Sequence, residues 1–196
     1  MVAEAIFLVS RVVVGGMFLV ALVSKVRDLP SFRSALRGFR VVPRRLERPV
    51  TFAVLGAEAA AVLLMVDQTS APIGLAVAAV LLVAFAVGMV RVLARGERVP
   101  CGCFGRSAAP ISRAHVWRNG LLAATGVAGL VAGLTSGAGP LDGPTQLVLS
   151  LFAVAVVAVL LLSDQLLAVP EPPRRPEPRH HRPPVDSPST GTTRKR

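Results

Sequence analysis

Cys101 and Cys103 are the only thiols in the 196-residue chain, and a single glycine separates them. A thiolate can attack a disulfide, and a neighbouring thiol can then resolve the mixed disulfide, so such a pair can carry reversible thiol–disulfide exchange. Arg98 and Arg106 flank the pair, and nearby positive charge favours the thiolate. A disulfide closed over one residue would add little stability, because the stabilisation grows with loop length. We therefore interpret the pair as a redox couple, with two inert loop thiols as the alternative.

The cysteine count limits what else this pair could do. A structural zinc site takes four Cys or His ligands, and the surrounding sequence adds only His115. We therefore expect no metal at the pair. The other histidines, His180 and His181, lie in a Pro- and Arg-rich tail, where a solvated segment is the expected state.

Long apolar segments lie on both sides of the cysteine pair. The chain is 53% hydrophobic and only 17% charged, which is typical of a membrane protein and not of a soluble domain. A helix that crosses a bilayer needs about 20 predominantly apolar residues. Five segments approach or exceed that length: residues 5–24, 50–66, 72–90, 117–134 and 145–169. The sequence therefore predicts an all-α integral membrane protein in contact with membrane lipid.

The basic residues predict an orientation. Of the 22 Lys and Arg residues, all except Arg11 fall in residues 25–48, 91–118 and 170–196. The connections 67–71 and 135–144 contain none. Because cytoplasmic loops are enriched in Lys and Arg, we predict that the N-terminus lies outside and the C-terminus in the cytoplasm. The cysteine pair would then lie at the cytoplasmic face.

The net charge of +11 also raises the question of nucleic acid. The basic residues instead cluster beside apolar spans, which is a sign of membrane topology, so we expect no nucleic-acid partner. Residues 170–196 combine many prolines with basic residues and lack apolar periodicity, which predicts a disordered tail.

Two ionisable residues, Arg11 and Glu58, fall inside predicted spans. Charged groups in a membrane usually face a partner or a water-filled cavity. Their estimated depths are similar, so we predict that Arg11 pairs with Glu58. A role for Glu58 as a proton carrier or ligand contact is the alternative. Between the first two spans, residues 31–37 could form a short interfacial helix with Phe32 and Leu36 on its apolar side.

Taken together, these residues resemble the MauE family of methylamine-utilisation membrane proteins, within the wider DoxX-like group. The resemblance covers about residues 5–134. Its most specific part is Cys101-Gly102-Cys103-Phe104-Gly105, which follows Arg95-Gly96. The other matching positions are Arg11, Gly15, Phe18, Lys25, Asp28, Phe32, Pro43, Glu58, Arg118 and Asn119.

The resemblance implies a DoxX-like four-helix bundle, joined here by a fifth transmembrane helix. It also implies a helper in methylamine metabolism that works with a thioredoxin-like protein to form disulfides in the methylamine dehydrogenase small subunit. Cys101 and Cys103 would be its redox pair. The implied supporting residues are Arg11, Lys25, Glu58, Gly102, Phe104, Gly105, Arg118 and Asn119.

Two alternatives remain open at this stage. One is a non-catalytic assembly factor whose loops dock a partner protein. The other, from the DoxX-like relatives, is electron transfer to a quinone, with Glu58 taking the proton. The redox interpretation also meets a conflict: disulfides normally form outside the cytoplasm, whereas the arginines place the cysteine loop inside. We keep the cytoplasmic assignment because the charge asymmetry is complete.

Overall fold

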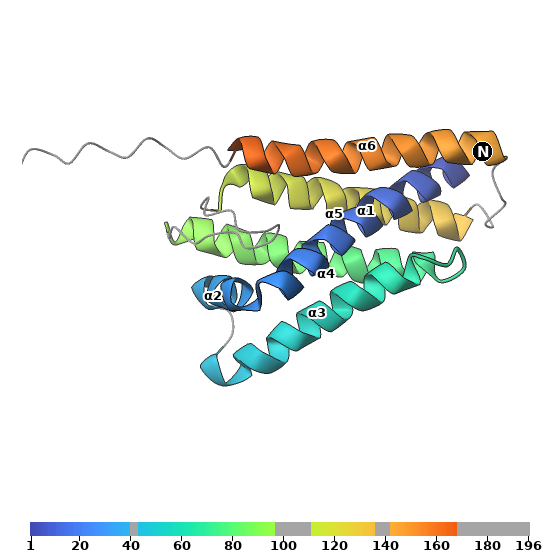
Figure 1. Ribbon diagram of the computed structural model, residues 1–196. Helices are drawn as coiled ribbons and strands as arrows, with labels where there is room; N and C mark the ends of the chain where they lie inside the picture. Colours follow the sequence, from blue (N-terminus) through green and yellow to red (C-terminus); the bar gives the residue numbers. More distant parts are fainter. Residues whose placement is uncertain (40–42, 97–110, 136–141, 168–196) are drawn as a thin grey trace, which may run out of the picture.

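The computed structural model describes residues 1–39, 43–96, 111–135 and 142–167, and these residues form helices and turns without a strand. Five long helices and one short one make an elongated bundle (Figure 1). The elements are α1 (Val2–Arg27), α2 (Leu29–Phe39), the 3-10 turn η1 (Arg44–Leu46), α3 (Glu47–Leu64), α4 (Ala71–Ala94), α5 (Arg113–Thr135) and α6 (Gly143–Leu167). The all-α prediction is confirmed. The cysteine pair and the tail 170–196 lie outside the described residues.

Each predicted span corresponds to one long helix, and most of the helices extend beyond the predicted limits. Polar groups form the helix ends that hydropathy leaves out. The Asp67 carboxylate accepts a hydrogen bond from the Ser70 backbone N–H at 3.1 Å, just before α4. The Asp142 carboxylate accepts bonds from the backbone N–H and the hydroxyl of Thr145, at 3.2 and 2.9 Å, at the start of α6. The Asp142 bonds cap α6 by satisfying an N–H group that has no partner within the helix, whereas the Asp67 bond orders the turn that leads into α4.

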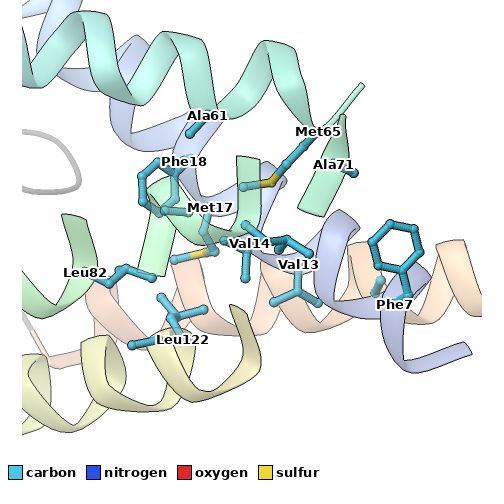
Figure 2. Close-up of a cluster of buried hydrophobic side chains, with 14 of the residues drawn as sticks. Phe7, Val13, Val14, Met17, Phe18, Ala61, Met65, Ala71, Leu82 and Leu122 are labelled. Carbon is cyan, nitrogen blue, oxygen red and sulfur yellow. The ribbon is translucent and has the colours of Figure 1, made fainter. Parts of the chain in front are cut away.

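Helix α1 is the centre of the bundle, and it contacts α3, α4, α5 and α6. Its Phe7, Val13, Val14 and Met17 are buried in the main hydrophobic core (Figure 2). Helix α4 packs along α5, and α6 packs against α1. The core therefore forms around a single helix whose neighbours are drawn from the whole described chain.

A row of glycines brings α5 close to α1. A Cβ atom added at Gly129 would lie 2.4 Å from the Ser10 Cβ, and one added at Gly133 would lie 2.7 Å from the Phe7 ring. Both distances are far inside van der Waals contact. The stripe of small residues in α5 is therefore a packing surface, the role that small residues have in membrane helices.

Three of the helices are long and apolar enough to cross a membrane: α1, α4 and residues 143–163 of α6. Large apolar side chains such as Val80 and Leu151 project outward from them and are more than half exposed. Helices α3 and α5 lie alongside but are more polar. Helix α3 contains Glu47, Arg48 and Glu58, and α5 contains Arg113, Arg118 and Asn119. The protein is therefore a membrane protein with an outer surface suited to lipid.

The short helix α2 confirms the helix predicted at residues 31–37, but its orientation differs. Phe32 and Ala35 are buried, whereas Leu36 is only partly covered. Phe32 thus faces the bundle and not the membrane interface. In Figure 1, α2 lies at the same end of the molecule as the C-terminus of α4 and the N-terminus of α5.

Candidate functional site

A buried ion pair joins α1 to α3 near this end of the bundle. The Lys25 Nζ lies 2.5 Å from the Glu58 Oε1, and the two side chains are only 2% and 1% exposed. Removing two charges from water costs several kcal/mol per ion, so the pair persists only with close geometry and further polar contacts. Each of the two buried charges therefore depends on the other for its stabilisation.

The predicted pairing of Arg11 with Glu58 is wrong. The Arg11 Nη2 instead donates a hydrogen bond to the Val66 carbonyl at 3.1 Å, beyond the end of α3. Val66 lies eight residues after Glu58, or about 12 Å along a helix at 1.5 Å per residue. Arg11 is therefore level with the end of α3, and the long side chain of Lys25 reaches Glu58 from the opposite direction.

Two aromatic rings complete the surroundings of the Lys25 ammonium. The ring centroids of Phe32, on α2, and Phe85, on α4, each lie 5.5 Å from the Nζ. A cation at this distance from a ring face is attracted by the ring quadrupole, and more strongly where water is excluded. The charge on Lys25 is thus stabilised by groups from three helices: α2, α3 and α4.

A small cavity of about 20 Å³ adjoins the pair. Its polar wall consists of Lys25, Glu58 and Asn119, and Asn119 is only 4% exposed. The rest of the wall is apolar, and is formed by Met17, Phe18, Ala21, Leu82, Phe85 and Leu122. Among the described residues, the Glu58 Oε2 has no hydrogen-bond partner. The site therefore combines a charged pair, an amide and an apolar surface around one small cavity.

The structure brings together three of the predicted site residues, Lys25, Glu58 and Asn119, and Phe18 of the resemblance pattern lines the same cavity. Arg11 lies elsewhere along α1, and Arg118 precedes Asn119 on α5 and is half-buried. The remaining predicted site residues, Cys101, Gly102, Cys103, Phe104 and Gly105, lie outside the described residues. The redox assignment of the cysteines therefore stays a prediction.

The described residues on either side of residues 97–110 are well anchored. Gly96 ends α4 with a φ of +67°, a conformation that glycine adopts without strain. Ile111 is buried against Met89 and Val92 of α4. The Arg95 Nη2 donates to the Phe39 carbonyl at 2.7 Å and so ties the end of α4 to α2. The two attachment points therefore belong to the end of the bundle that holds the ion pair.

Sequence reasoning missed the cavity and the contribution of Phe85. In the sequence, a phenylalanine that contacts a cation cannot be distinguished from one that only packs in the core, when both lie in an apolar span. Phe32 did belong to the resemblance pattern, and its contact with Lys25 gives that position a physical role.

The fold and site define a class: a helical membrane protein with a buried ion pair that lines a small cavity near one end of its bundle. The family model described as "Methylamine utilisation protein MauE" matches residues 3–132. The curated "Methylamine utilization protein MauE" of Paracoccus denitrificans is 37% identical over an alignment of 153 residues, and the alignment covers 73% of this chain and 82% of that protein. The chain therefore belongs to the MauE family and is linked by it to methylamine utilisation. No solved structure matches the chain.

Proposed function

We propose that the protein is a membrane helper of methylamine utilisation that exchanges disulfides with a partner protein through Cys101 and Cys103. The observation that carries the proposal is the position of the pair in the chain. Residues 97–110 connect α4 to α5, and both helices contribute side chains to the cavity beside Lys25 and Glu58. The only two thiols of the chain thus belong to the connection between two helices of the polar site.

The exchange proceeds in two balanced steps. A thiolate of the pair attacks one sulfur of a partner disulfide, the partner S–S bond breaks, and the second partner sulfur leaves as a thiolate. The other cysteine, as its thiolate, then attacks the mixed disulfide, which closes the Cys101–Cys103 bond and releases the reduced partner. The reverse sequence passes a disulfide to the partner. The reduction potentials of the two proteins set the direction.

A thioredoxin-like protein is the proposed partner, because the resemblance to the family implies it and because its dithiol chemistry matches the pair. The proposed orientation has the N-terminus outside and the C-terminus in the cytoplasm, as the segregation of Lys and Arg supports. A disulfide passed to a protein outside the cytoplasm would require the opposite placement of the cysteines. Orientation is therefore the sharpest test of which partners are accessible.

The decisive experiment replaces each thiol in the full-length chain. Cys101→Ser and Cys103→Ser should each abolish growth on methylamine in a host that lacks its own MauE-family gene, with membrane abundance unchanged. One of the two variants should also accumulate a heavier band on gels run without reductant, as the trapped mixed disulfide. Ser107→Ala is the matched control, since it changes the same connection without touching a thiol.

Full activity in both serine variants would overturn the redox proposal. The non-catalytic assembly factor would then replace it, since that function requires the connection but not its sulfur atoms. Loss of activity in Ser107→Ala as well would likewise favour docking over redox chemistry.

A further inference from the structure

The second carboxylate oxygen of Glu58 lacks a donor within the described structure. Oε1 receives the Lys25 ammonium, whereas Oε2 is buried and unpartnered. Buried polar atoms in folded proteins are nearly always hydrogen-bonded, either to protein or to ordered water. An ionised oxygen without a donor is especially costly, because it keeps its desolvation penalty with no compensation. A donor is therefore required at this carboxylate.

The adjoining cavity is the space from which a donor can come. Its volume of about 20 Å³ exceeds the ~10–15 Å³ that one water molecule needs. Its polar wall of Lys25, Glu58 and Asn119 also distinguishes it from the apolar cavities that stay dry.

We propose that this cavity is a binding site for an internal water molecule that hydrates the Lys25–Glu58 pair. The water donates one hydrogen bond to the Glu58 Oε2. Its second O–H and its lone pairs are directed to the Asn119 amide and to the Lys25 ammonium, which has donors beyond the one used for Oε1. Three polar groups are within the two to four partners that buried waters have.

The water site links α1, α3 and α5 through one small molecule. Asn119 alone brings α5 into this network, so the water extends the ion pair from two helices to three. The inference is independent of the thiol chemistry, because it involves no residue of the segment 97–110.

The test uses X-ray radiolysis of the purified full-length protein, in which bound water produces hydroxyl radicals in place. Met17 lines the cavity and is 1% exposed, and Met65 lies in the same core away from the cavity and is 4% exposed (Figure 2). A thioether is readily oxidised to the sulfoxide. Met17 should be oxidised several-fold faster than Met65, although Met65 is the more exposed to bulk solvent. Equal rates, or a faster rate at Met65, would overturn the proposal.

A second variant separates bound water from other sources of radicals. Ala21→Leu fills the cavity, so oxidation of Met17 should fall to the rate of Met65, and the melting temperature should fall because the Glu58 Oε2 loses its donor. Ala84→Leu, an equal change on an exposed face of α4, should alter neither measurement. A raised melting temperature in Ala21→Leu would show a dry cavity. Unchanged rapid oxidation of Met17 in that variant would show that the radicals arise elsewhere. If Ala21→Leu fails to fold, the comparison of Met17 with Met65 in the unaltered protein still decides.

Discussion

Lys25 and Glu58 are 33 positions apart in the sequence, yet their charged atoms lie 2.5 Å apart in the interior of the bundle. The pair joins the last turn of α1 to the second half of α3, so the long basic segment between them is folded back over one end of the molecule. This contact makes stability depend on two buried charges that compensate each other.

Removing one member of the pair should be severely destabilising. Glu58→Leu leaves the Lys25 ammonium buried without a counter-charge, and Lys25→Met does the same to the carboxylate. Breaking a buried pair in this way costs about 3–5 kcal/mol. The double variant should be more stable than either single variant, because it removes both charges together. Thermal unfolding of the four proteins in detergent gives the coupling as a double-mutant cycle.

Arg11→Gln is the control for that cycle. It removes the single bond to the Val66 carbonyl, so it should cost about 1.5–3 kcal/mol at most and combine additively with Glu58→Leu. Coupling between Arg11 and Glu58 that exceeds the coupling between Lys25 and Glu58 would contradict the observed pairing.

Close packing of α5 on α1 should make Gly129 intolerant of a methyl group. Gly129→Ala places a Cβ 2.4 Å from the Ser10 Cβ, which forces the helices apart. Overpacking of this kind typically costs about 1–3 kcal/mol. Gly120→Ala is the matched control on the same helix, because no atom lies within 4 Å of its added Cβ. It should raise stability by up to about 1 kcal/mol through its better helix propensity. Equal effects of the two changes on thermal unfolding would argue against this helix contact.

The turn between α3 and α4 should be sensitive to acid. Bonds from the Thr69 hydroxyl, and then from the backbone N–H of Ser70, lower the pKa of Asp67 below its ordinary value of 3.8. A lowered pKa gives stabilisation that is complete above the ordinary value and is lost as the pH falls through the lowered one. The difference in melting temperature between the unaltered protein and Asp67→Asn should therefore be constant near neutral pH and shrink in strong acid.

Thr69→Val tests the cause of that acid response. It removes the largest contribution to the lowered pKa, so the loss of stabilisation should begin at a higher pH than in the unaltered protein. An unchanged acid profile would show that the Thr69 hydroxyl does not determine the titration of Asp67.

The orientation can be measured with reporter fusions at two described positions. Ser70, in the turn before α4, should report outside, and Gly38, in α2, should report inside. The physical reason is the retention of Lys and Arg on the cytoplasmic side. Reversed signals would move the cysteine connection outside, where disulfide formation normally occurs, and would redirect the search for partners to that compartment.

The predictable part of this protein is the part set by apolar runs. Segments such as residues 72–90 can only be long helices in lipid, because every backbone group must be satisfied internally. The ion pair was not predictable in the same way. Lys25 directly follows an apolar run and looks like the start of a solvent-exposed loop, although α1 continues to Arg27 and the lysine points inward. Arg11 looked like the natural partner because helix depth was counted from hydropathy limits, and these limits omit the polar ends.

Helix α6 makes its main contacts with α1 alone, and the family match ends at residue 132, before it begins. Among the described side chains of α6, none lines the cavity or contributes to the Lys25–Glu58 pair. Its influence on the polar interior is therefore indirect, through Ala153, which is fully buried in the main hydrophobic core beside α1.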